Sequence, residues 1–140
     1  MKRPVGNSTK NQLWQHVSAA IEVDITLGIM IPLLLRTAAK WKIPKELALS
    51  VIARDLRCIY CHRDFGSPQG PRAACPSWEH IVNNQSIVSL ENIALCCVGC
   101  NASKGTKPLG LWLTTKYCND RSISRQSIGV VAIASLALGP

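Results

Sequence analysis

Four of the seven cysteines in the chain form two pairs with the spacing of metal ligands. Each pair has two residues between its members: Cys58 and Cys61, then Cys97 and Cys100. The tight turn of such a pair places both sulfur atoms on one side of the backbone, and two turns complete a tetrahedron around Zn²⁺. We therefore predict a closed, structural zinc site. Buried free thiols are the alternative.

The other three cysteines lack this spacing. Cys97 is chosen over its neighbour Cys96 because it gives the two-residue spacer, and on an extended strand Cys96 would point the other way. We interpret Cys75, Cys96 and Cys118 as small buried residues. An odd cysteine number without an evident signal peptide favours a reducing, cytoplasmic compartment and metal ligation over disulfides.

A second group of polar residues lies between and just after the cysteine pairs: Glu79, His80, Asn92, Asn101 and Lys104. A histidine, with an unperturbed pKa of ~6.5, is available as a base near neutral pH. A carboxylate and an amide oxygen form a hard, oxygen-only site of the kind that suits Mg²⁺ or Mn²⁺. A base beside a divalent cation is what the hydrolysis of a phosphodiester requires.

The run from Ile43 to Lys107 resembles the HNH endonuclease family. The resemblance is carried by Trp78-Glu79-His80-Ile81-Val82, by Glu91-Asn92-Ile93-Ala94-Leu95, and by Cys97-x-x-Cys100-Asn101-x-x-Lys104-Gly105. It implies a ββα-metal fold inside a four-cysteine zinc site, and a nuclease that leaves 5′-phosphate and 3′-hydroxyl ends in DNA. Two positions hold less common members of the family pattern: Glu79 in place of Asp, and Asn101 in place of His.

The resemblance also implies a role for each polar residue. His80 would be the general base, and Asn92 would hold the loop or orient that histidine. Glu79 and Asn101 would hold the catalytic Mg²⁺ or Mn²⁺, and Lys104 would contact a phosphate. Taken singly, these residues are as readily explained as a hydrogen-bonded histidine, a turn residue, a helix cap and surface charges, so only their joint spacing favours the nuclease.

These residues need short elements to position them. A helix is expected to begin at Pro44, with an apolar face of Leu47, Val51, Ile52 and Leu56. Short strands are expected over 78–82 and 93–95, and a helix over 98–104 that Gly105 ends.

Outside this middle segment the patterns are less specific. The apolar residues between Leu13 and Ile29 fit both a helix and a strand, and we favour a helix. The apolar tail from Ile128 to Leu138 fits a docked helix or a strip that binds a partner. Trp14, Trp41, Trp78 and Trp112 are interpreted as core anchors.

The length of 140 residues suits one compact domain. We expect an α+β fold with a helical N-terminal extension over 1–42, the nuclease core over 43–107, and a C-terminal extension over 108–140 that packs on the core or on a partner. No apolar run reaches the ~20 residues of a membrane span, so no membrane partner is expected.

Positive charge is concentrated in the flanks. The chain has a net charge of +8, and residues 1–57 carry nine Lys or Arg against four acids, whereas 58–107 carry four against three. This imbalance fits a polyanion such as double-stranded DNA. The candidate phosphate contacts are Lys40, Lys42, Lys45, Arg54 and Arg57, which would otherwise be solvated surface.

Two other functions remain open. One is a non-catalytic zinc module that binds nucleic acid through its basic flanks. The other is a protein-interaction scaffold that uses the apolar tail. A homodimer would matter for a nuclease, because one site cuts one strand.

Overall fold

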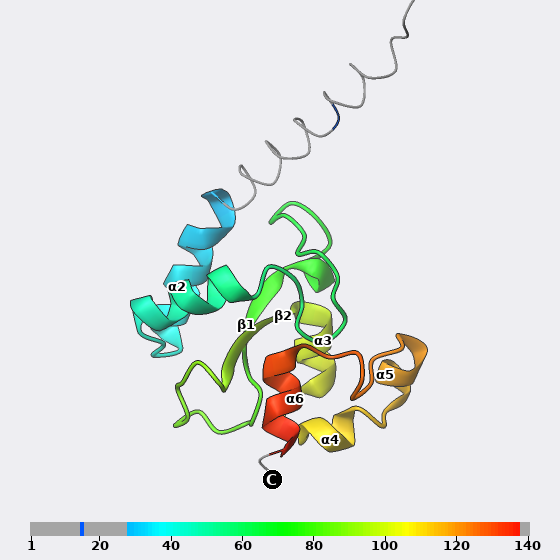
Figure 1. Ribbon diagram of the computed structural model, residues 1–140. Helices are drawn as coiled ribbons and strands as arrows, with labels where there is room; N and C mark the ends of the chain where they lie inside the picture. Colours follow the sequence, from blue (N-terminus) through cyan, green and yellow to red (C-terminus); the bar gives the residue numbers. More distant parts are fainter. Residues whose placement is uncertain (1–14, 16–27, 138–140) are drawn as a thin grey trace, which may run out of the picture.

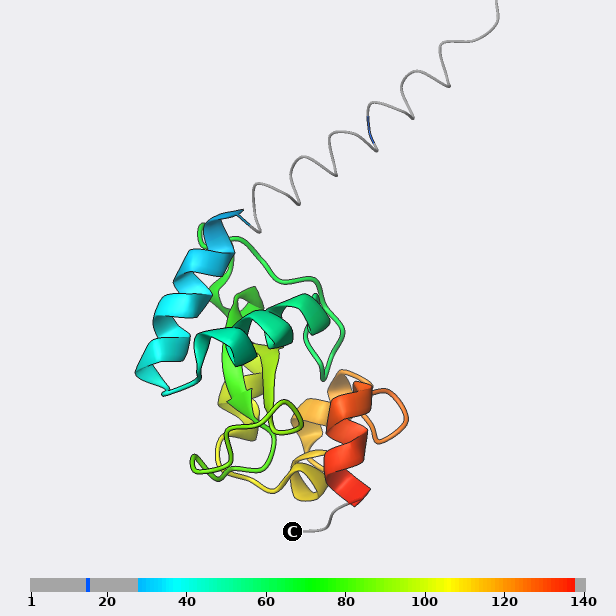
Figure 2. The ribbon, with the colours of Figure 1, turned by 60° about the vertical axis from the view of Figure 1, so that its left-hand side comes forward.

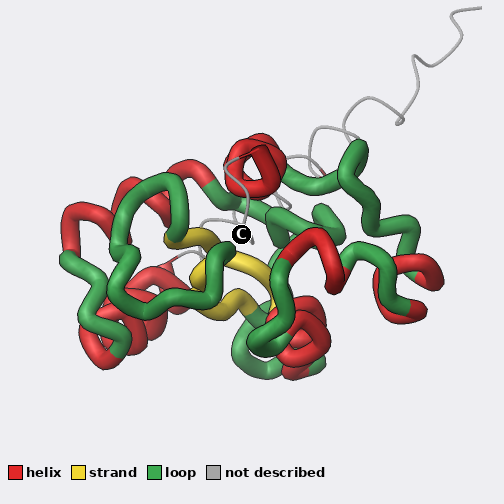
Figure 3. The backbone as a smooth tube through the Cα atoms, turned by 90° about the horizontal axis from the view of Figure 1, so that it is seen from below, coloured by secondary structure: helices red, strands yellow, loops and turns green. Residues whose placement is uncertain are grey.

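Two short antiparallel strands, β1 (Pro76–His80) and β2 (Ile93–Cys97), lie between two groups of helices (Figure 1). The computed structural model describes residue 15 and residues 28–137. The fold is mixed α+β, as expected, and Figure 3 shows the strands in yellow at the centre with helices around them. In the described part of the chain, no helix has both the length and the apolar character that a membrane span needs.

Side chains alternate between the two faces along each strand, and both faces of the sheet are covered. The register pairs Trp78 with Leu95 and His80 with Ile93, so these four side chains share one face. The alternate residues, Glu79 among them, lie on the other face. Every residue of β2 is buried, which is the pattern expected for a strand covered on both sides.

The face that carries Trp78 is covered by helical residues 28–40 and by α2 (Lys45–Arg54). Leu34, Ala38 and Val51 pack there, and the Trp78 indole donates a hydrogen bond to the Leu34 carbonyl at 2.9 Å. α2 begins after Pro44, as predicted.

The other face is covered by the later helices: η1 (Arg72–Ala74), α3 (Val98–Lys104), α4 (Leu109–Trp112), α5 (Lys116–Asp120) and α6 (Val130–Ala137). In Figure 2, α6 and α4 lie at the opposite end of the molecule from residues 28–40. Trp112 is fully buried among these helices, and the centroids of its ring and the Tyr60 ring are 4.9 Å apart. The predicted helix over 98–104 is confirmed, and Gly105 ends it with a φ of 52°.

The apolar tail is a docked helix. Ile128 and Ala132 are buried, and the Gly129 amide donates to the Ile59 carbonyl beside the first cysteine pair. A Cβ at Gly129 would meet that carbonyl oxygen at 3.2 Å, so glycine permits this close approach.

Side chains at the end of α2 also bind the backbone of β2. The Asp55 carboxylate accepts a hydrogen bond from the Leu95 amide at 2.9 Å, and Arg54 donates to the Ile93 carbonyl at 2.8 Å. Arg54 and Asp55 pair with each other at 2.7 Å. The pair therefore fixes the end of α2 against the sheet.

Some expectations from the sequence are wrong. Leu56 is 65% exposed and does not belong to the apolar face of α2, because the helix has already ended at Arg54. Trp41 is 45% exposed and is not a core anchor, whereas Trp78 and Trp112 are. Trp14 and most of the expected helix between Leu13 and Ile29 lie outside the described residues.

Candidate functional site

The four predicted cysteines come together in one cluster. The sulfur atoms of Cys58, Cys61, Cys97 and Cys100 all lie within 4.8 Å of one another, close enough to hold a metal ion such as zinc. The Cys61 and Cys97 sulfurs are 3.8 Å apart. A tetrahedral site with bonds of ~2.3 Å separates its sulfurs by about 3.8 Å, so the cluster fits zinc in size as well as in donor type.

Three elements bring the cluster together: the loop after α2, the end of β2 and the first turn of α3. The Cys97 sulfur accepts a hydrogen bond from the Cys100 amide at 3.4 Å, and the Tyr117 hydroxyl donates to the Cys100 sulfur at 3.7 Å.

Cys96 lies outside the cluster, as expected from strand alternation. It is buried beside Ser77 on the α3 face of the sheet, where burial raises the pKa of its thiol. Of the other two cysteines, Cys118 is buried and Cys75 is half-buried.

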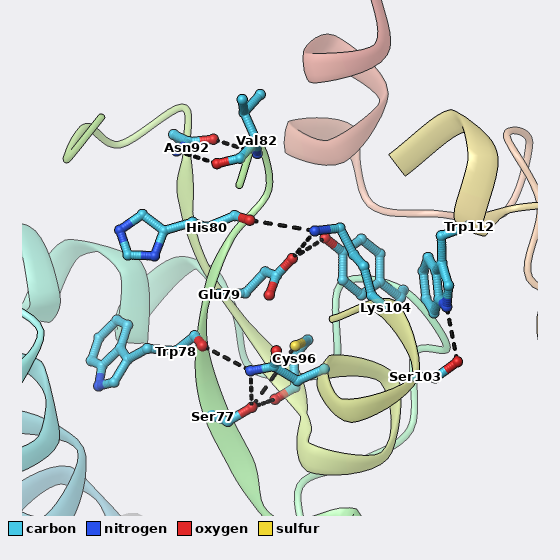
Figure 4. A network of polar contacts seen from close by, with 12 residues as sticks. Ser77, Trp78, Glu79, His80, Val82, Asn92, Cys96, Ser103, Lys104 and Trp112 are labelled. Carbon is cyan, nitrogen blue, oxygen red and sulfur yellow. Dashed lines mark hydrogen bonds and ion pairs between the residues drawn. The ribbon is translucent and has the colours of Figure 1, made fainter. Parts of the chain in front are cut away.

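His80 is the last residue of β1, and its ring points toward the helical residues 28–40 and α2 (Figure 4). The side chain is 5% exposed, and its ring stacks on the Trp41 ring with centroids 5.5 Å apart and planes 17° apart. Nε2 is buried and has no hydrogen-bond partner within the described part of the chain. Burial and, secondarily, the Lys104 charge lower the pKa of His80, so the imidazole is neutral at pH 7.

A pocket of about 450 Å³ adjoins this histidine. It lies between the end of the helical residues 28–40 and the loop that follows β1. Its lining is basic and aromatic, and it consists of Lys40, Trp41, Lys42, His80, Gln85 and Ser86.

Glu79 leaves the opposite face of β1 (Figure 4). It is 4% exposed, its carboxylate lies 2.6 Å from the Lys104 ammonium, and it accepts a hydrogen bond from Tyr60 at 3.0 Å. Burial raises the pKa of Glu79, and the Lys104 charge opposes that shift. Burial, and then the Glu79 charge, hold the pKa of Tyr60 well above its usual value, so Tyr60 remains a neutral donor.

Lys104 differs from the expectation of a phosphate contact. Its side chain is fully buried, because it reaches from α3 back into the sheet. There it pairs with Glu79 and donates to the His80 carbonyl at 3.4 Å. The Lys104 charge is therefore compensated inside the protein and does not face a substrate. The Lys104 side chain also links α3 to His80, the residue expected to be the base.

Asn101 also binds the backbone of β1. Its amide nitrogen donates to the Trp78 carbonyl and to the Ser77 hydroxyl, both at 2.9 Å. The structure thus places Asn101 and Glu79 on the side of β1 that α3 covers, and His80 on the other. The three expected residues do not converge on one open site, because β1 stays paired through His80 and does not bend between Glu79 and His80.

Asn92 holds the loop, one of the two roles expected for it. Its carbonyl oxygen accepts from the Val82 amide at 2.7 Å, and its amide nitrogen donates to the carbonyls of Val82 and Ile87. These bonds close the segment between β1 and β2, so Asn92 fixes where His80 leaves the sheet.

Sequence reasoning missed two residues of this site, Trp41 and Tyr60. Trp41 stands directly between Lys40 and Lys42, and that alternation of basic and aromatic residues was an available signal. Tyr60 lies inside the first cysteine pair, and nothing in the sequence connects it with Glu79.

Comparisons of the chain with protein families, with curated proteins and with solved structures found no match.

Proposed function

We propose that the protein is a divalent-metal-dependent endonuclease of the HNH type, which hydrolyses phosphodiester bonds in DNA. The observation that carries the proposal is the state of His80, a neutral, buried imidazole whose Nε2 has no partner among the described residues. The succession of β1, β2 and α3 around a four-cysteine cluster also supports it.

His80 acts as the general base in this proposal. A neutral imidazole with a free nitrogen takes a proton from the attacking water, and its lowered pKa keeps it unprotonated at pH 7. Lys40 and Lys42 line the adjoining pocket and attract the phosphate backbone.

Glu79 and Asn101 would hold the catalytic Mg²⁺ or Mn²⁺. Within the described residues, no hydrogen bond reaches Oε2 of Glu79 or Oδ1 of Asn101, so one oxygen of each remains for an ion. When bound, the ion neutralises charge on the phosphate and on the leaving oxygen. Because Lys104 already pairs with the other Glu79 oxygen, we expect weak binding that needs an excess of the ion.

The arrangement also limits where a substrate lies. His80 and Glu79 leave opposite faces of β1, so a phosphodiester that is reached from both must lie across the end of the strand, beyond His80.

Cleavage of supercoiled plasmid with Mg²⁺ or Mn²⁺ tests the proposal. We expect the unmodified chain to nick or linearise the plasmid. The His80→Ala variant should lose cleavage, because no other group on that face takes the proton, while its zinc content and circular dichroism spectrum stay unchanged.

His62→Ala is the matched control, since it removes an exposed imidazole outside the pocket. It should cleave like the unmodified chain. An unchanged cleavage rate in His80→Ala would refute the assignment of the base.

One observation favours a second function, a non-catalytic zinc module that binds nucleic acid. The Glu79 carboxylate is already neutralised by the buried Lys104, as in a purely structural ion pair. Tight, salt-sensitive DNA binding without turnover in Mg²⁺, Mn²⁺ and Ni²⁺ would favour this function over the nuclease.

A further inference from the structure

The pocket beside His80 contains an aromatic surface that the general base does not need. Trp41 is 45% exposed, whereas Trp78 and Trp112 are 2% and 0% exposed. An exposed indole leaves a large apolar area in water. That area contributes no burial free energy to the stability of the fold. The exposed part of the ring is therefore available to a partner.

The Trp41 ring stacks on the His80 ring, with centroids 5.5 Å apart. Its stacking on His80, with planes 17° apart, orients the indole without covering all of it. An exposed aromatic ring is a surface on which a nucleobase can stack, because every base has a π face.

Positive charge flanks this ring on both sides in the sequence. Lys40 and Lys42 are exposed, line the same pocket, and form no ion pair within the described part of the chain. No acidic residue lines the pocket. Two ammonium groups beside an indole complement the phosphates and the base of a nucleotide.

Lys42 lies at a backbone position where lysine is unfavourable. Its φ is 58°, in the left-handed region that favours glycine. A glycine would end the helical residues 28–40 equally well. Lys42 thus combines an unfavourable backbone conformation with a positive charge at the pocket.

We propose that Trp41, Lys40 and Lys42 form a nucleotide subsite in which the indole stacks on an unpaired base and the two lysines contact its flanking phosphates. Inside a duplex both faces of a base are covered by neighbouring base pairs. The subsite therefore takes single-stranded DNA, a strand end or a base turned out of the helix. This inference rests on the proposed function and names its substrate class.

The test measures binding of fluorescein-labelled single-stranded oligodeoxyadenosine by fluorescence anisotropy, with no added divalent ion so that cleavage is avoided. A matched oligonucleotide of abasic residues has the same phosphates and no bases. We expect the unmodified chain to bind the normal strand more tightly than the abasic one. Trp41→Leu should weaken binding of the normal strand about tenfold and leave the abasic strand unchanged.

Further variants separate stacking from folding and from charge. Trp41→Phe keeps an aromatic ring and should retain most of the preference for the normal strand. Lys42→Gln should weaken both strands and reduce the salt dependence, whereas Lys116→Gln, on exposed α5, should not. Leu111→Ala removes another exposed apolar side chain, 60% exposed, and should have no effect.

Equal binding of normal and abasic strands by the unmodified chain overturns the proposal, as does full affinity in Trp41→Leu. Failure of the nuclease proposal is distinguishable. A chain that prefers the normal strand but cuts no plasmid has the subsite without the activity. A chain that cuts plasmid and shows no Trp41 effect has the activity without the subsite.

Discussion

At the residue scale, the decisive feature is the buried pair of Glu79 and Lys104. The two groups are 4% and 0% exposed, and they contact each other at 2.6 Å. The Tyr60 hydroxyl also donates a hydrogen bond to Glu79, and the His80 carbonyl accepts one from Lys104. Two charges out of water are tolerated only when each compensates the other, so the pair behaves as one unit.

We predict that Glu79→Gln and Lys104→Met each destabilise the fold by about 3 kcal/mol or more, because each leaves one buried charge without its partner. The double variant should cost clearly less than the sum of the two, since both charges are then absent. Urea denaturation with saturating zinc measures all three.

The exposed pair of Lys116 and Asp120 is the control, and Lys116→Met should change the stability little. Small, additive effects of the Glu79 and Lys104 substitutions would show that the pair is not coupled.

At the scale of the element, the end of the helical residues 28–40 forms one wall of the pocket. Lys42 takes the left-handed conformation there, and the Ile43 amide donates back to the Ala38 carbonyl at 2.9 Å. This is how a helix that lacks a terminal glycine turns back on itself. The turn presents Trp41 to His80, so the geometry of the pocket depends on it.

We predict that Lys42→Gly raises the free energy of unfolding by about 1 kcal/mol, because glycine adopts a positive φ without steric cost. The same variant should bind single-stranded DNA more weakly, since it loses an ammonium group. Thermal or urea denaturation and oligonucleotide binding are the two measurements.

Lys40→Gly is the control, and it should change the free energy of unfolding in the opposite direction. Lys40 is helical, so glycine there should destabilise the chain. If both substitutions lower the stability, the lysine at position 42 is not strained.

The sequence was informative wherever a signal is local. The spacing of the cysteine pairs was sufficient to predict the cluster, and Val98 to Lys104 followed by Gly105 was sufficient for α3. The sequence could not show that Glu79 and His80 point to opposite faces of the sheet. That depends on whether β1 stays paired with β2 as far as His80, and the pairing is determined by β2. The exposure of Trp41 depended likewise on tertiary packing, because its ring lies against His80, which is far along the chain.

At the scale of the whole molecule, the four cysteines connect segments that are far apart in the sequence. Cys58 and Cys61 follow α2, whereas Cys97 and Cys100 join β2 to α3. The Gly129 amide binds Ile59 inside the first pair, so the docking of α6 depends on the same loop. The cluster thus joins the N-terminal, central and C-terminal parts of the described chain.

We predict that the protein binds one zinc ion per chain and loses its folded structure when a strong chelator removes it, because the binding free energy of such a site is folding free energy. Circular dichroism during chelation, with zinc quantified by atomic emission, measures this. Cys58→Ser should have the same effect. Cys75→Ser is the control, because Cys75 lies outside the cluster, and this variant should keep both its zinc and its folded structure. If the unmodified chain stays folded after its zinc has been removed, the prediction is wrong.

The side chains that bind the backbone of the sheet have a consequence for self-association. Arg54 and Asp55 bind the Ile93 carbonyl and the Leu95 amide of β2, and Asn101 and Lys104 bind the carbonyls of Trp78 and His80 in β1. These side chains compete with a strand from another molecule for the same backbone groups, which protects the sheet from edge-to-edge aggregation.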